Sequence, residues 1–551
     1  MASQPFPVVQ SAVDLRKPEY QTNHENWGSI LDEFEANLCQ VASEGNETSL
    51  QKHRERGQLL PRDRITLLLD ADSPFLELGS FAGFRQPQSN SCANLIAGIG
   101  LVSGRPCLLM SHIPTQSGGA WNEMTGRYFD SPLNYMPCRP DNATVLKVNR
   151  IMEIGLENDL PLISLVQSAG VFLPQQFRVF HKGGQLFRDL AVRSQRGKPS
   201  CAIVFGSCTA GGAYHPALSD HTIFVDKQAQ VFLGGPPLVK MATGETIEAE
   251  ELGGASVHGT KTGLADELAI DEFDAIQKAR EWVATLRNTC ALPPVIDSPP
   301  LYSIDELLYL CNPDIRKPLN MREVLVRIVD GSRLLQFKPQ YGPNMLTAWA
   351  HIHGSRVGIV ANQTPVINPH EALKTAHFIR ICNQELTPIV FFHNVTGFMV
   401  GPKAEHAGII KAGAQLVSAV SCSNVPHISI IVGASYGAGN YAMCGRSYHP
   451  RFLFTWPTGR CSVMGPDQLA GVMETIKAKS SKGAGSDSKE QGQMLRDEAF
   501  RDSECYSTSS ILVDDGVIDP RDTREVLGMC LGVVKAPEAH HVESHRLLAR
   551  I

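Results

Sequence analysis

Two glycine-rich segments are the residues of this chain best suited to chemistry. Gly206–Tyr214 (GSCTAGGAY) and Gly433–Tyr441 (GASYGAGNY) follow the short apolar runs 201–205 and 428–432, which are typical of buried parallel strands. The segments that come next, 214–218 and 441–444, can be helical. A strand–glycine turn–helix unit leaves backbone N–H groups unpaired at the start of the helix, and small residues let a ligand approach them. Such donors suit either a phosphate or a developing oxyanion.

The motifs that would favour other chemistry are weaker. Neither turn matches G-x-G-x-x-G, and the chain has no G-x-x-x-x-G-K-[ST] loop, so an oxyanion is favoured over a nucleotide phosphate. Residues 433–437 (GASYG) satisfy the G-x-S-x-G elbow of serine hydrolases, in which Ser435 would act with an acid and a base such as Asp514 and His540. The corresponding residue of the first turn is Cys208, where the motif is absent. Ser435 is therefore interpreted as part of a shared backbone turn.

The two turns belong to a longer internal repeat. Four anchors recur at one constant offset of 227 residues (388 − 161, for example), which predicts two similar lobes in tandem. The pairs are Pro161/Pro388, Gly170/Gly397, Gly206/Gly433 and Tyr214/Tyr441. A site shared between such lobes is where function is expected.

The repeat also reveals an insertion in the first lobe. Gly104 and Gly354 correspond at an offset of 250, so the first lobe has 23 more residues (250 − 227) before the next anchor. The polar, aromatic and proline-containing segment at about 121–142 accounts for them. We expect it to form an excursion on the surface or over a site.

Composition is that of an ordinary globular protein with more than one domain. At 551 residues the chain exceeds the roughly 250–300 that one hydrophobic core serves. Its net charge of −6 disfavours nucleic-acid binding. No apolar run approaches the roughly 18 residues of a membrane span. Fourteen cysteines without a C-x-x-C pair predict reduced thiols and no metal site.

The domain boundary and the compartment follow from local composition. Residues 291–300 contain four prolines, which predicts domains at 1–290 and 291–551. The acidic residues among 1–27 do not fit a mitochondrial leader, and 549–551 loosely resemble a peroxisomal signal. From the sequence we expect a cytoplasmic or peroxisomal protein.

Six motifs resemble the carboxyltransferase (β) subunits of biotin-dependent acyl-CoA carboxylases, and are most similar to the methylcrotonyl-CoA carboxylase β subunit. They are residues 206–217, 231–240, 394–401, 435–446, 450–454 and 514–520. The resemblance spans about 31–534. It implies an α/β fold of two tandem crotonase-like (ClpP/crotonase superfamily) domains, 1–290 with the insertion at 121–142 and 291–551. It also implies a mitochondrial location, although no leader is evident. By the same resemblance the insertion would lie near the acyl end of the CoA pocket, where Trp121, Tyr128, Phe129 and Tyr135 could cover a larger acyl chain; the alternative is a surface loop.

The resemblance implies a mechanism that agrees with the amide donors of the turns. One lobe holds the thioester carbonyl of an acyl-CoA such as 3-methylcrotonyl-CoA while its enolate forms, and the other stabilises the urea oxygen of biotin as carboxybiotin releases CO2. The motif places the second amide pair at Ala438 and Gly439, and the repeat places the first at Gly211 and Gly212. The opposing, substrate-binding walls would be Gly170, Val171, Gly397 and Phe398.

The resemblance also implies partners. The chain has no M-K-M biotin attachment site and no recognisable ATP-binding loop, so biotin is expected on a separate biotin carboxylase/biotin carrier (α) subunit. Family members form a homo-oligomer, a β6 core. No metal, nucleic acid or membrane partner is expected.

Some residues depart from the family pattern, mostly on the acyl-CoA side. Residues 167–170 are QSAG instead of D-S-G-G, 117–123 are SGGAWNE instead of K-G-G-x-Y-Y-P, and Gln415 replaces a common lysine. Three alternatives stay open: a carboxyltransferase with a different acyl-CoA, a non-carboxylating crotonase-like CoA enzyme, and an inactive structural subunit. A crotonase hydratase usually needs paired glutamates near the thioester, and no convincing pair lies beside either turn.

Overall fold

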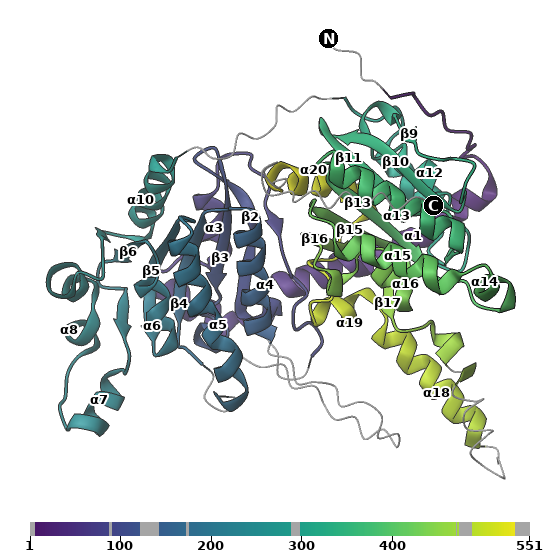
Figure 1. Ribbon diagram of the computed structural model, residues 1–551. Helices are drawn as coiled ribbons and strands as arrows, with labels where there is room; N and C mark the ends of the chain where they lie inside the picture. The colour runs from purple at the N-terminus through teal and green to yellow at the C-terminus, as the bar shows by residue number, and fades with distance from the viewer. Residues whose placement is uncertain are drawn as a thin grey trace. The chain divides into compact units, whose positions relative to one another are not determined.

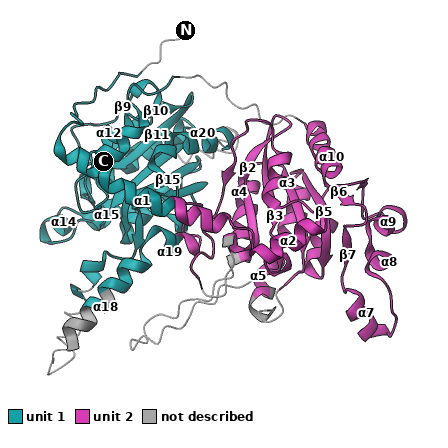
Figure 2. Cartoon of the chain, turned by 180° about the vertical axis from the view of Figure 1, so that it is seen from behind, with its two compact units in different colours: residues 1–34, 292–508, 517–551 teal, residues 35–291, 509–516 magenta. Residues whose placement is uncertain are grey.

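The chain forms two compact α/β units, coloured separately in Figure 2. Unit 1 comprises residues 1–34, 292–508 and 517–551, and unit 2 comprises 35–291 and 509–516. The computed structural model describes residues 6–86, 91–121, 143–171, 176–287, 298–469, 471–472 and 487–534. The expected domains were contiguous, whereas 1–34 and 509–516 are each grouped with the lobe remote from them in sequence. Most of the proline-rich segment, 288–297, lies outside the described residues.

Unit 2 is built on a mainly parallel sheet of order β1-β2-β3-β4-β5-β6-β8, with β7 paired to β5 (Figure 1). Only the β1–β2 and β2–β3 pairs are antiparallel. The strands are β1 (Leu76–Glu77), β2 (Leu95–Val102), β3 (Arg105–His112), β4 (Leu162–Ser168), β5 (Ser200–Thr209), β6 (His221–Val225), β7 (Gln230–Phe232) and β8 (Glu267–Ala269).

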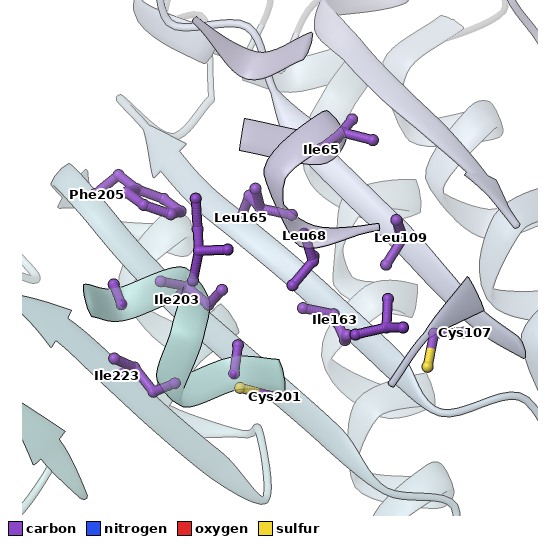
Figure 3. Packing of buried hydrophobic residues seen from close by; sticks show 14 of the residues in the cluster. Ile65, Leu68, Cys107, Leu109, Ile163, Leu165, Cys201, Ile203, Phe205 and Ile223 are labelled. Carbon is purple, nitrogen blue, oxygen red and sulfur yellow. The ribbon is translucent and has the colours of Figure 1, made fainter. Parts of the chain in front are cut away.

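Alternate residues along the strands of unit 2 point to opposite faces of the sheet. Ile163 and Ile203 face one way, toward Ile65 of α3 and Ile276 of α10, in the buried cluster of which Figure 3 shows a part. Leu108 faces the other way, against α4. The helices are α2 (Glu47–Glu55), α3 (Pro61–Leu68), α4 (Ala143–Glu157), α5 (Gln176–Gln195), α6 (Gly211–Ala217), α7 (Pro236–Thr243), α8 (Ala249–Gly253), α9 (Ala255–Val257) and α10 (Glu272–Thr285).

Unit 1 repeats this plan with a sheet of order β16-β15-β13-β11-β10-β9 and β17 paired to β15. A separate parallel pair joins β12 (Val366–Ile367) to β14 (Gly397–Phe398). The main strands are β9 (Leu335–Gln336), β10 (Met345–Ile352), β11 (Ser355–Asn362), β13 (Ile389–Val395), β15 (His427–Tyr436), β16 (Phe452–Thr455) and β17 (Arg460–Ser462).

The helices of unit 1 include two that share one buried cluster with the sheet, α13 and α15. The long helix α1 (Pro18–Ala42) begins in this unit. The others are α11 (Leu307–Leu310), α12 (Met321–Leu325), α13 (Pro369–Gln384), α14 (Pro402–His406), α15 (Ile409–Ser421), α16 (Gly437–Ala442), α18 (Asp487–Asp502), α19 (Cys505–Ser510) and α20 (Thr523–Val533). Within the described ranges, no helix combines the length and apolarity that crossing a membrane requires.

The internal repeat is confirmed by strand register. Ile163 pairs with Cys201, and Val390 pairs with Ile428, so both partners move by 227. The irregularity in each pairing also falls at the same place, between 166 and 168 and between 393 and 395. The β2–β3 and β10–β11 hairpins correspond at 250, as Gly104 and Gly354 predicted. The 23-residue difference therefore lies between β3 and β4, and residues 122–142 are outside the described ones.

Buried polar contacts repeat as well. Lys147 donates from Nζ to the Leu95 carbonyl at 2.5 Å, and Lys374 (374 − 227 = 147) donates to the Met345 carbonyl at 2.8 Å. Asp70 accepts from the amide of Gly104 in one hairpin turn, and an aspartate of unit 1 does the same in the other. Each lobe therefore contains equivalent hydrogen bonds from these lysine and aspartate side chains to the backbone.

Candidate active site

The first glycine turn links β5 to α6 in unit 2. Strand β5 ends at Thr209, and α6 begins at Gly211, three residues before the helix expected from the sequence. Ala210 joins them with φ 52° and ψ −120°, a conformation that a side chain disfavours. Gly211 and Gly212 are thus the first residues of a helix, where an amide has no intrahelical partner. Neither amide donates to another described residue.

Gly170 forms a wall directly beside this turn. It has φ +81°, and a Cβ there would lie 2.8 Å from the Thr209 carbonyl oxygen. A Cβ at Gly212 would lie 3.1 Å from the Ser168 carbonyl oxygen. The Thr209 hydroxyl also donates to the Ala169 carbonyl at 2.9 Å. The structure therefore brings Gly170 together with the first amide pair, and glycine is required at both positions by backbone approach.

The segment that departs from the family pattern lies against this wall. The Ala169 amide donates to the Gly118 carbonyl at 3.0 Å, and the Trp121 amide donates to the Gly170 carbonyl at 2.9 Å. Val171 pairs with Trp121 in an isolated parallel bridge. The main chain of 118–121 therefore continues the wall outward from the turn.

Aromatic side chains flank the first turn, and the sequence analysis did not single out one of them, Phe187. The Trp121 ring is 6.2 Å from the Phe187 ring, which is 5.7 Å from the ring of Tyr214. A Cβ on Gly211 would lie 3.5 Å from the Phe187 ring. Trp121 was expected to shape an acyl pocket, but Phe187 is one apolar residue of a helix and nothing in its spacing marks it. The other aromatic residues proposed for the insertion, at 128, 129 and 135, lie outside the described residues.

The second glycine turn links β15 to α16 in unit 1. Gly437 begins α16 with φ +55°, at the position equivalent to Ala210 (437 − 227). Ala438 and Gly439 follow as the next two residues of the helix. Their amides, like those of the first pair, donate to no other described residue. The helix again begins three or four residues earlier than the sequence predicted.

Gly397 stands against this turn as Gly170 stands against the first. A Cβ on Gly439 would lie 2.7 Å from Val395 Cγ2 and 3.1 Å from the Cα and N of Gly397. A Cβ on Gly397 itself, where φ is +137°, would meet nothing within 4 Å. Phe398 packs its ring on Gly413 of α15, 3.2 Å from a Cβ built there. Gly397 therefore lies beside Gly439, while Phe398 anchors the wall to a helix.

Ser435 does not have the surroundings of a hydrolase nucleophile. Its Oγ lies 2.9 Å from Nδ1 of His393 and accepts from Nδ2 of Asn440 at 2.8 Å. The side chain is completely buried, so a substrate carbonyl has no access to Oγ. Of the acid and base suggested by the motif, His540 lies outside the described residues and Asp514 is grouped with unit 2. The interpretation of residue 435 as part of a backbone turn fits these contacts.

Neutral groups surround both turns. Burial lowers the pKa of His112 to about 4, and burial together with the neighbouring His112 lowers the pKa of His215 in α6 to about 3. Burial also lowers the pKa of His393 to about 3. These imidazoles are uncharged near neutral pH, so they bring no positive charge to the turns. Among the described residues, no cluster of His, Cys, Asp and Glu has the arrangement of a metal site.

Comparison with known proteins identifies the family. Residues 52–547 match the carboxyl transferase domain model. The chain belongs to the carboxyl transferase family. It is 44% identical to a probable biotin-dependent acyl-coenzyme A carboxylase beta2 subunit of Mycobacterium tuberculosis, over 96% of this chain and 97% of that one. It is 42% identical to the mitochondrial methylcrotonoyl-CoA carboxylase beta chain of Arabidopsis thaliana, over 95% of this chain and 89% of that one.

A solved structure extends the similarity to the fold. The β subunit of geranyl-CoA carboxylase from Pseudomonas aeruginosa superposes with a TM-score of 0.87 at 36% identity, covering 96% of this chain and 97% of that one. The resemblance to carboxyltransferase β subunits and the expected tandem crotonase-like fold are confirmed. As a carboxyl transferase family member, the protein is an enzyme subunit of the acyl-CoA carboxylase type.

Proposed function

We propose that this carboxyltransferase moves a carboxyl group from biotin, carried by a separate α subunit, to an acyl-CoA such as 3-methylcrotonyl-CoA. The observation that carries the proposal is the pair of equivalent turns, each with two adjacent unpartnered amides against a glycine wall. Two amides converging on one oxygen are what a developing oxyanion requires.

The first turn is proposed to act on the acyl-CoA. The amides of Gly211 and Gly212 donate to the thioester oxygen and stabilise the negative charge that develops there when the γ-carbon of the enoyl group loses a proton. Gly170 and Val171 confine the thioester on the opposite side. Loss of one such donor typically lowers the rate by about 10²–10³.

The second turn is proposed to act on biotin. Its amides, at Ala438 and Gly439, are adjacent, donate to no other described residue and lie beside Gly397, which fits the oxygen of a cyclic urea. When bound, carboxylated biotin supplies the CO2 and leaves a nitrogen that serves as the base. The chain's own part is to hold the urea oxygen with the two amides, to place the ring against Gly397 and Phe398, and to exclude water.

The likeness to a geranyl-CoA carboxylase β subunit supports a second candidate substrate with a longer acyl chain. The ring series of Trp121, Phe187 and Tyr214 beside the first turn favours it, because such rings can pack along a prenyl chain. Purification with the biotin-carrying subunit, followed by ATP-dependent fixation of bicarbonate, separates the candidates. Fixation on 3-methylcrotonyl-CoA alone supports the first, and fixation on geranyl-CoA supports the second.

Assembly is part of the proposal. We expect a homo-oligomer, a β6 core, in which the acyl-CoA turn of one subunit works with the biotin turn of its neighbour. Mixing a Gly211→Pro chain with a Gly439→Pro chain should restore part of the activity. No recovery, with both variants folded and assembled, would count against shared sites.

A further inference from the structure

A chain of three buried side chains connects all the elements that form the second turn. Ser435 is the second-last residue of β15, Asn440 lies in α16, and His393 lies on β13 just before the wall at Gly397. The Ser435 hydroxyl lies 2.9 Å from His393 Nδ1 and 2.8 Å from Asn440 Nδ2. The Ser435–Asn440 bond therefore closes the backbone loop that contains the amides of Ala438 and Gly439.

Hydrogen-bonding capacity fixes a direction for this chain. The Asn440 amide nitrogen only donates, so Ser435 Oγ accepts from it. His393 is neutral, because burial lowers its pKa to about 3. A neutral imidazole whose hydrogen is on Nε2 accepts the serine hydroxyl proton at Nδ1. Ser435 then donates to His393 and accepts from Asn440.

The first lobe has no such chain at the equivalent positions. Subtracting 227 from His393, Ser435 and Asn440 gives residues that are all apolar or nearly so and that belong to one buried cluster. They are Val166, Cys208 and Ala213. The backbones of the two turns are alike, but at these three positions the first turn has apolar packing where the second has side-chain hydrogen bonds.

We propose that Ser435, with Asn440 and His393, is a positioning residue that holds the Ala438 and Gly439 amides in the geometry needed to bind the urea oxygen of biotin. The inference rests on the proposed function and adds residues of the same site. Amides stabilise developing charge only when they are held within about 0.5 Å of the productive position. A buried, fully oriented hydrogen-bond chain resists displacement more than apolar contacts do, because apolar contacts are not directional.

The test uses the complex with its biotin-carrying subunit and compares Ser435→Ala with Ser435→Thr. Ser435→Ala should lower kcat about 10-fold to 100-fold, less than the loss of an oxyanion donor itself. The KM for acyl-CoA should stay within about 2-fold, because the first turn is unchanged. Ser435→Thr keeps the hydroxyl and should recover most of kcat. Asn440→Ala should add little to Ser435→Ala, because both break the same chain.

Ser429→Ala is the matched control for a loss of stability alone. Ser429 is also a buried serine of β15, but its hydroxyl donates to the Cys444 carbonyl at 2.8 Å, beyond the far end of α16. It should lower Tm as Ser435→Ala does while leaving kcat within about 2-fold. The proposal is overturned if Ser435→Ala keeps wild-type kcat, or if Ser429→Ala lowers kcat equally. Absence of carboxylation by the wild-type complex would instead refute the proposed function.

Discussion

Substitution of Gly439 by alanine separates the presence of an amide donor from its position. Alanine keeps the N–H group, so the number of donors in the second turn is unchanged. The added Cβ would lie 2.7 Å from Val395 Cγ2 and 3.1 Å from both Cα and N of Gly397. Two of these contacts are with backbone atoms, which cannot rotate away. The start of α16 and the wall at Gly397 must therefore move apart.

The displacement sets the expected size of the effect. Relaxing a 2.7 Å carbon–carbon contact to the normal 3.5–4.0 Å requires a shift of about 1 Å, shared between helix and wall. A misplacement of that order lowers the rate of an enzyme by about 10²-fold. Overpacking also lowers the free energy of unfolding by about 1–3 kcal/mol. We expect Gly439→Ala to assemble, to lose about 10-fold to 100-fold in kcat, and to keep its KM for acyl-CoA.

The assay is ATP-dependent fixation of labelled bicarbonate by the reconstituted complex. Val395→Ala in the Gly439→Ala background removes the shortest contact and should recover part of kcat. Gly28→Ala is a control for glycine replacement in the same unit: a Cβ there meets nothing within 4 Å in helix α1. It should stabilise unit 1 by about 0.5–1 kcal/mol without changing kcat. Wild-type kcat for Gly439→Ala, in an assembled protein, would refute the placement of the second amide pair.

Three further predictions follow from contacts and pKa values. A fluorophosphonate probe should leave Ser435 unlabelled in the folded protein, because its hydroxyl is completely buried; labelling detected by mass spectrometry would restore the hydrolase interpretation. Burial lowers the pKa of Lys374 to about 8, so between pH 8 and about 10.4 the unfolded chain binds a proton that the folded one does not, and stability from this group rises with pH. The difference in urea midpoint between wild type and Lys374→Met should therefore move in favour of wild type from pH 7.5 to 9.5, and a constant difference would contradict the shift. Trp121→Ala should raise the KM for acyl-CoA and lower the free energy of unfolding by about 3–5 kcal/mol, because the ring is 3% exposed and packs on Gly183; an unchanged KM would exclude it from the acyl pocket.

The repeat explains how much of the fold could be predicted from the sequence. Replacing a glycine with positive φ, such as Gly170 or Gly397, strains the backbone. The spacing of these glycines therefore marks the register of the repeat in the sequence. Strands β4 and β5 are apolar on both faces, so they too can be predicted from the sequence. The bounds of the compact units were harder to predict from the sequence. The grouping of residues 1–34 with the second lobe depends on long-range contacts, such as the hydrogen bond from the Trp27 ring nitrogen to the Cys311 carbonyl.

The sequence could predict the backbone of the two turns but not the side chains around them, and the roles of the turn residues stay a prediction. The positions of Gly211, Gly212, Ala438 and Gly439 followed from the motif and the repeat. The partners of Ser435 did not, because His393 is 42 residues away and only the parallel pairing of β13 with β15 brings it near. Nothing in the sequence marks Lys147 and Lys374 as buried, yet both lie in the interior and donate to carbonyl groups.

The measurement that tests the central claim most directly is carboxylation by the reconstituted complex with and without its biotin-carrying partner. We predict ATP-dependent incorporation of labelled bicarbonate into an acyl-CoA by the complex, and none by this chain with ATP when the biotinylated subunit is omitted. Incorporation by the purified chain alone, or none by the complete complex with either 3-methylcrotonyl-CoA or geranyl-CoA, would contradict the account.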